Sequence, residues 1–105
     1  MPEDPAPFAE LNRMIHEPAR LAILSVLSGC ESADFLFLQS ATGLSKGNLS
    51  VQISRLEEAG LVYVDKVIRK KGTLTTIWLS GEGQAQMRRY WETMDAIRRQ
   101  GQPSE

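Results

Sequence analysis

The chain has 105 residues, of which 42% are apolar and 24% are charged, and a formal net charge of −1 at pH 7; these values fit one domain with a modest core. No apolar run approaches the roughly 20 residues that cross a bilayer, and the opening residues, MPEDPAP, are acidic and proline-rich, so neither a membrane span nor a secretory signal is expected. The single cysteine, Cys30, can form no internal disulfide, which favours a reducing, cytoplasmic location.

Positive charge is unevenly distributed along the chain. Residues 45–73 contain six basic and three acidic residues, whereas residues 1–44 contain two basic and six acidic ones. A surface that faces nucleic-acid phosphates needs such a local excess of positive charge. The distribution therefore keeps nucleic-acid binding open although the total charge is slightly negative.

The first 29 residues predict a tail followed by two helices. Residues 1–7 contain three prolines and two acids, which is typical of a flexible lead-in. Apolar residues at helical spacing predict a short amphipathic helix over residues 8–15. A second helix is expected to begin near Pro18, which suits a first helical turn, and to end at about Gly29. Its nearly continuous apolar content predicts deep burial.

Two polar residues beside the start of this second helix are interpreted as structural. His16 is the only histidine and has no partner residues for a metal site, so a capping or surface role is expected. Arg20 lies in the first turn and is expected to pair with Glu17 or with another acid.

Residues 31–59 predict two helices joined by a tight turn. Residues 31–34 are polar and predict a turn, in which Ser32 or Asp34 caps a helix over residues 35–42. Gly43 ends that helix, and a second helix follows over residues 45–59. This arrangement is typical of a helix-turn-helix, in which the first helix braces the second across the groove of DNA.

The helix over residues 45–59 has one apolar face and one face of mostly short polar side chains. Leu49, Ile53 and Leu56 recur at helical intervals and predict the buried face. A helix fits the major groove when its exposed side chains are short and polar. The candidate DNA-binding residues on or beside that exposed face are Ser45, Lys46, Gly47, Asn48, Ser50, Val51, Ser54 and Arg55.

A β-hairpin is predicted after this helix. The runs over residues 61–68 and 74–79 are rich in β-branched residues, and a basic tip separates them. Such a tip is often only a solvated turn. Directly after a candidate recognition helix, however, a wing over residues 66–73 can contact DNA backbone or minor groove through Arg69, Lys70 and Lys71.

A final helix is expected over residues 81–99, capped by Ser80 and followed by a frayed tail over residues 100–105. Its large side chains recur at heptad spacing, which indicates either packing on the same domain or self-association; we expect self-association. The candidate dimer-interface residues, including two from the predicted first helix, are Phe8, Leu11, Met87, Tyr90, Trp91, Met94 and Ile97.

Three stretches resemble small one-domain winged helix-turn-helix transcriptional regulators of the broad MarR/ArsR-like group. They are EPARLAILSVL, TGLSKGNLSVQISRLEEAGLVYV and the closing LSGEG, and the resemblance covers roughly residues 17–94. It implies a bracing helix, a recognition helix, a wing and a C-terminal dimerisation helix, in the order already reached from the residues. It also implies double-stranded DNA and a second copy of the chain as partners.

The resemblance also raises the question of a ligand. ArsR-type metal sensors have cysteine clusters, whereas this chain has only Cys30 and His16, so no metal or cofactor is expected. MarR-type proteins often enclose a small organic effector. Trp78, Tyr90 and Trp91 could line such a pocket or could simply belong to the core.

The expected fold is mainly α with a small β-hairpin: a winged helix-turn-helix over residues 8–99 whose N- and C-terminal helices form a dimer interface. The expected function is sequence-specific binding of double-stranded DNA by a homodimeric transcriptional regulator. An enzyme is not expected, because the chain lacks a phosphate-cradling glycine motif, a nucleophile with a plausible base and a metal cluster. The alternative is a winged-helix scaffold or protein-interaction module without sequence-specific DNA binding.

Overall fold

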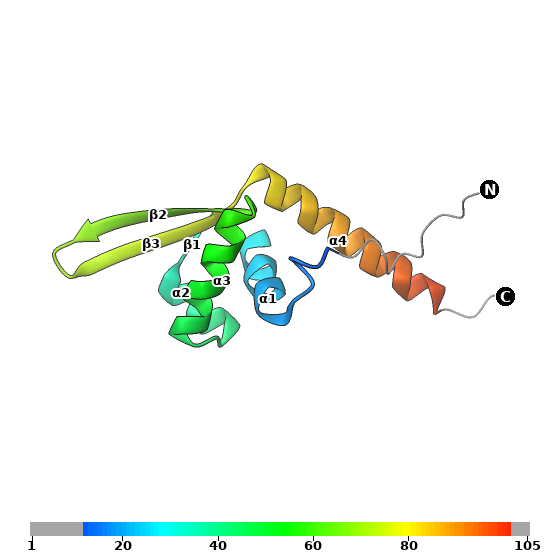
Figure 1. The fold of residues 1–105 in the computed structure, drawn as a ribbon, viewed down its shortest axis with the longest axis horizontal. Helices are drawn as coiled ribbons and strands as arrows, with labels where there is room; N and C mark the ends of the chain where they lie inside the picture. The colour runs from blue at the N-terminus through cyan, green and yellow to red at the C-terminus, as the bar shows by residue number, and fades with distance from the viewer. Residues whose placement is uncertain (1–11, 102–105) are drawn as a thin grey trace.

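The computed structural model describes residues 12–101, which form four helices and a three-stranded antiparallel sheet (Figure 1). The elements in chain order are α1 (Pro18–Ser28), β1 (Ala33–Asp34), α2 (Phe35–Thr42), α3 (Lys46–Glu58), β2 (Val62–Arg69), β3 (Gly72–Leu79) and α4 (Gly81–Gln100). The predicted tail over residues 1–7, together with Phe8 and Leu11, lies outside the described residues. Of the predicted C-terminal tail over residues 100–105, Gln100 belongs to α4 and Gly101 caps that helix, whereas residues 102–105 lie outside the described residues.

Local hydrogen bonds set the bounds of the helix-turn-helix. The Asp34 carboxylate accepts from the N–H of Phe37 at 2.7 Å and caps α2, which ends at Gly43 with φ of +73°. The Ser45 hydroxyl accepts from the N–H of Asn48 at 3.1 Å and caps α3. The predicted helices over residues 35–42 and 45–59 are therefore confirmed, the second with residues 45 and 59 as its caps.

The predicted helix over residues 8–15 is wrong where it can be tested. Asn12–Ile15 form a turn, in which the His16 N–H donates to the Asn12 carbonyl at 2.7 Å. The Asn12 side-chain oxygen accepts from the N–H groups of Met14 and Ile15 at 2.9 and 3.3 Å. This local pairing gives the backbone an alternative to a continuing helix.

The polar stretch before α2 contains a short strand that the sequence did not predict. Ala33 and Asp34 pair with Ile77 and Thr76 of β3, which gives the sheet order β1-β3-β2. The pairing satisfies backbone groups on β3 that a two-stranded hairpin would leave open, and it buries Ala33 to 6% exposure. The expected hairpin is thus two strands of a three-stranded sheet.

The core lies where α1, α2 and α3 meet the base of the sheet. It contains Ile23, Leu24 and Leu27 of α1, Leu38 of α2, Leu49, Ile53 and Leu56 of α3, and Ile77 of β3. The deep burial predicted for α1 is confirmed. Beyond Val64, β2 is exposed, so the outer part of the hairpin projects from the domain as a wing (Figure 1).

Helix α4 is joined to the domain at its first turn. The Ser80 hydroxyl accepts from the Gly83 N–H at 2.9 Å and donates to the Gly60 carbonyl at 2.6 Å. Met87 and Tyr90, expected at a dimer interface, are 3% and 2% exposed and pack in the core of the domain. The second half of α4 extends past α1 (Figure 1), with Trp91 still 49% exposed.

Candidate nucleic-acid interface

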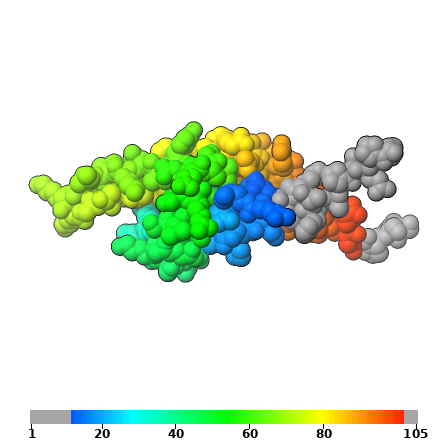
Figure 2. Space-filling model, viewed as in Figure 1, coloured from blue at the N-terminus to red at the C-terminus, as the bar shows by residue number. Residues whose placement is uncertain are grey.

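Helix α3 presents its polar face to solvent. Leu49, Ile53 and Leu56 are at most 5% exposed and hold the opposite face in the core. Figure 2 shows α3, in green, lying at the surface in the centre of the view, with the wing extending from it. Each of the eight candidate residues predicted for this helix is exposed: Ser45, Lys46, Gly47, Asn48, Ser50, Val51, Ser54 and Arg55.

The three cations predicted for the wing lie at its tip. Arg69 ends β2, Lys70 and Lys71 form the turn, and all three are exposed. Gly72 has φ of +112°, a conformation that side-chain-bearing residues rarely adopt, and this lets the chain reverse there. The structure therefore arranges the predicted residues as two groups, one along α3 and one at the far end of the hairpin.

A shallow groove separates α3 from the wing. Ser50 and Ser54 line it from α3, and Lys66 and Thr75 line it from the two strands. Lys66 and Thr75 were not among the predicted contact residues, although Lys66 contributes to the basic excess of this part of the chain. Glu57 also lines the groove, so its α3 side combines hydroxyl groups with one carboxylate.

Arg20 anchors the outer surface of α3 to the rest of the domain. Its side chain is 12% exposed; its Nε donates to the Met14 carbonyl at 2.6 Å, and its Nη1 donates to Oε1 of Gln52 at 3.0 Å. Nη1 also lies 3.8 Å from a Glu17 carboxylate oxygen, so the predicted structural pairing is confirmed. Gln52 was missed because nothing local signals a partner 32 residues away.

Glu17 has a second role as the N-cap of α1. Its carboxylate oxygens accept from the N–H groups of Ala19 at 3.2 Å and Arg20 at 2.8 Å. The hydrogen bond from the Arg20 N–H is the main cause that holds the pKa of Glu17 below its ordinary value of 4.5. Helix α1 therefore begins at a charged cap that also faces the Arg20 guanidinium.

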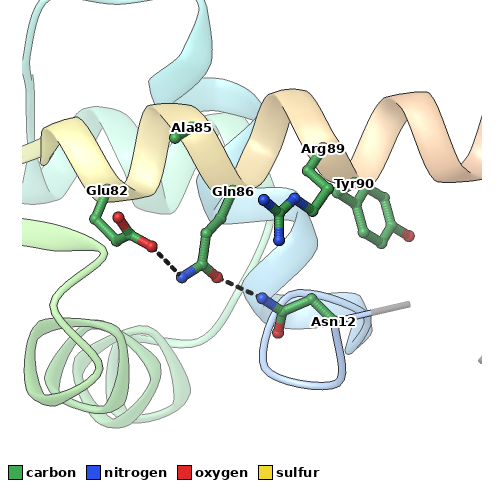
Figure 3. A pocket seen from close by; sticks show the side chains of 6 residues that line it. All are labelled: Asn12, Glu82, Ala85, Gln86, Arg89 and Tyr90. Carbon is green, nitrogen blue, oxygen red and sulfur yellow. Dashed lines mark hydrogen bonds between the residues drawn. The ribbon is translucent and has the colours of Figure 1, made fainter. Parts of the chain in front are cut away.

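The turn before α1 is tied to α4 by side-chain hydrogen bonds (Figure 3). The Asn12 amide donates to Oε1 of Gln86, whose Nε2 donates to a Glu82 carboxylate oxygen at 2.8 Å. His16 Nδ1 lies 2.8 Å from the hydroxyl of Tyr90, and burial raises the pKa of that phenol above its ordinary value of 10.0. Because Arg20 binds the same turn, the turn joins α4 to α3.

The three aromatic residues considered for an effector pocket lie in two separate aromatic contacts. Trp78 packs near Tyr63 at the base of the hairpin with ring centroids 5.7 Å apart, whereas Tyr90 and Trp91 form an edge-to-face pair on α4 at 5.2 Å. Cys30 is a half-buried free thiol in a groove that Trp91 also lines. Among residues 12–101, no three His, Cys, Asp or Glu side chains gather as a metal site would require.

Over residues 12–101, none of the helices combines the length and apolar character that crossing a membrane requires.

Comparison with known proteins agrees with this geometry. A model of the winged helix DNA-binding domain matches residues 19–97. An uncharacterised protein of Methanocaldococcus jannaschii is 30% identical over 78 residues, which are 74% of this chain and 85% of that relative. A transcriptional regulator homologue from Pyrococcus horikoshii is similar in structure, with a TM-score of 0.78 and 28% identity over 85% of this chain and 88% of that one.

The same fold occurs in a protein solved on DNA. The transcriptional repressor CouR, bound to a 23-mer DNA duplex, has a TM-score of 0.63 and 18% identity, over 74% of this chain and 54% of CouR. The protein belongs to the family of winged helix DNA-binding domains, which are transcriptional regulators rather than enzymes.

Proposed function

We propose that the protein is a homodimeric transcriptional regulator that binds double-stranded DNA in a sequence-specific manner through α3. The observation that carries the proposal is the exposure of the whole polar face of α3, with its apolar face held in the core. The major groove of B-DNA is about 12 Å wide and admits an α-helix. Gly47, Ser50 and Ser54 are short, so the α3 backbone can approach the base edges closely.

The wing supplies the contacts that do not depend on sequence. Arg69, Lys70 and Lys71 are exposed at the hairpin tip, and Lys66 lies in the groove between the wing and α3. Cations placed along phosphates set overall affinity and its dependence on salt. Because few long side chains are available on α3 for base contacts, we expect DNA shape and phosphate contacts to contribute much of the recognition.

The second half of α4 is proposed to form the dimer contact. Trp91, Met94 and Ile97 line an open apolar groove there. Trp91 is 49% exposed. Exposed apolar surface of this kind often marks a site of protein–protein contact. A two-fold dimer would present two α3 helices to half-sites about 34 Å apart, on one side of the duplex.

The experiment that tests this function is selection of bound duplexes from a random DNA pool. The expected product is a palindromic site, because two-fold protein symmetry requires matching half-sites. Binding to the selected site should weaken steeply as salt increases. If the protein bound no duplex from the pool even at low salt, the proposal would be contradicted.

Such a failure would favour the alternative of a protein-interaction module. Leu36 and Phe37, at the start of α2, are 75% and 51% exposed, which is the feature that such a module would use. The selection experiment separates the two functions, because a scaffold would enrich no sequence.

A further inference from the structure

The side chain of Asn48 on α3 is held by a chain of hydrogen bonds that begins at Arg20. Arg20 Nη1 donates to Oε1 of Gln52 at 3.0 Å, and Nε2 of Gln52 donates to Oδ1 of Asn48 at 3.1 Å. Arg20 is itself held by the Met14 carbonyl and is 12% exposed. The chain thus runs from a largely buried guanidinium to an exposed side chain on the DNA-facing helix.

The donor and acceptor roles in this series of hydrogen bonds follow from the chemistry of the Arg20 guanidinium. A guanidinium carries only donors, so the Gln52 group that faces Arg20 must be the carbonyl oxygen. The NH₂ group of Gln52 then faces Asn48, and Asn48 must present its oxygen in return. Rotating the Asn48 amide by 180° would place its NH₂ group against that of Gln52. Rotating the Gln52 amide would place its NH₂ group against the Arg20 guanidinium.

The consequence is that Asn48 has its donors available, while one of the two lone pairs of its side-chain oxygen is engaged by Gln52. Among residues 12–101, the Nδ2 of Asn48 donates to no other group, whereas its Oδ1 accepts from Gln52. The backbone N–H of Asn48 is bound to the Ser45 cap, so the residue is positioned at both backbone and side chain. It lies in the first turn of α3, the part of a recognition helix that contacts base edges.

We infer that Asn48 is a specificity-determining residue that selects keto bases, guanine or thymine, through its outward NH₂ group. The inference rests on the proposed function. Guanine offers the acceptors O6 and N7 in the major groove and thymine offers O4, whereas cytosine presents an amino donor and adenine places its N6 amino donor beside its N7 acceptor. A free asparagine pairs with adenine through both its oxygen and its nitrogen, and the bond from Gln52 disfavours that pairing because it turns the oxygen of Asn48 along α3 toward Gln52.

Two substitutions test this by changing one group each. Asn48→Asp replaces the outward NH₂ with oxygen and keeps an acceptor for Gln52, so the preferred base should change from keto to amino. Gln52→Met removes the bond that orients Asn48, so adenine should become acceptable at the same position. A change of about tenfold in relative affinity is expected in each case, the order of a single base contact.

The readout is selection from a random DNA pool with wild type and each variant. The position that Asn48 reads is identified as the one whose preference is lost in Asn48→Ala. Gln84→Met serves as the control, because Gln84 is exposed on α4 and lies outside the hydrogen bonds that run from Arg20 to Asn48. It should keep the wild-type preference.

The possible outcomes distinguish failure of this inference from failure of the proposed DNA-binding function. A wild-type preference for guanine or thymine that changes as described supports the donor role of Asn48. A wild-type preference for adenine at that position, or one unaltered by Asn48→Asp, overturns it while leaving DNA binding intact. If wild type enriches no sequence at all, the proposed function fails, and this inference fails with it.

Discussion

At Gly83 the backbone of α4 lies close to the backbone of Leu61. A Cβ atom built at this position would lie 2.1 Å from the Leu61 carbonyl oxygen, whereas one at Gly81 would meet nothing within 4 Å. Gly83→Ala should therefore lower the free energy of unfolding by about 1–3 kcal/mol, the usual cost of overpacking. Urea denaturation measures this, with Gly81→Ala as the matched control; equal stability of the two variants would contradict the close contact.

Glu17 should make stability depend on pH in the acid range. Because its folded-state pKa lies below the ordinary value of 4.5, the carboxylate contributes stability that is fully present above pH 4.5 and is lost as the pH falls through the folded pKa. Glu17→Ala should lower the free energy of unfolding by about 1 kcal/mol at pH 7, the typical value of an N-cap.

The measurement for Glu17 is a series of urea denaturation curves from pH 7 downward. The difference between wild type and Glu17→Ala should shrink as the pH falls below 4.5. Glu92→Ala, on an exposed face of α4, is the control and should show little change. A difference that stays constant with pH would show that the charge of Glu17 is not what stabilises the start of α1.

At the scale of elements, the wing and α3 should contribute differently to DNA binding. Lys70→Ala removes an exposed cation from the hairpin tip, so it should weaken binding to all sequences and reduce the salt slope by about one. Ser50→Ala removes a hydroxyl from the exposed polar face of α3 and should mainly alter sequence preference. Fluorescence anisotropy titrations at several salt concentrations measure both effects.

The control for the wing is Arg88→Ala, which makes the same change of charge on α4. It should leave the salt slope unchanged. If Lys70→Ala and Arg88→Ala behaved alike, the wing tip would not be a specific phosphate contact, and the loss of affinity would reflect total charge alone.

At the scale of the whole molecule, the second half of α4 should determine the oligomeric state. Ile97→Glu places a charge in the apolar groove of α4 and should raise the dimer dissociation constant at least about tenfold, equivalent to roughly 1.4 kcal/mol. Affinity for a palindromic site should fall with it, while affinity for a single half-site should be retained. Sedimentation equilibrium and DNA titrations measure the two quantities.

Gln84→Glu is the control for this substitution, since it adds the same charge to an exposed position in the first half of α4. It should leave the dimer intact. A wild-type protein that remains monomeric while it binds a palindromic site would contradict the role assigned to the second half of α4.

The helix and hairpin bounds were predictable from sequence because they depend on neighbours in the chain. Asp34, Ser45 and Ser80 each cap the helix that follows by accepting an N–H from three residues further on. The richness in β-branched residues likewise predicted the two long strands. The exposed candidate residues of α3 were predictable from the helical spacing of its apolar residues, since burial of one helical face leaves the opposite face in solvent.

Contacts between distant parts of the chain were decided only by tertiary packing. Strand β1 exists because Ala33 meets Ile77, and Gln52 joins the site because α1 brings Arg20 beside it. Heptad spacing could not separate Met87 and Tyr90, which fill their own core, from the more exposed Trp91. Periodicity shows which face of a helix is apolar. Which part of that face is buried depends on how far the neighbouring elements extend along it, and only the folded structure decides this.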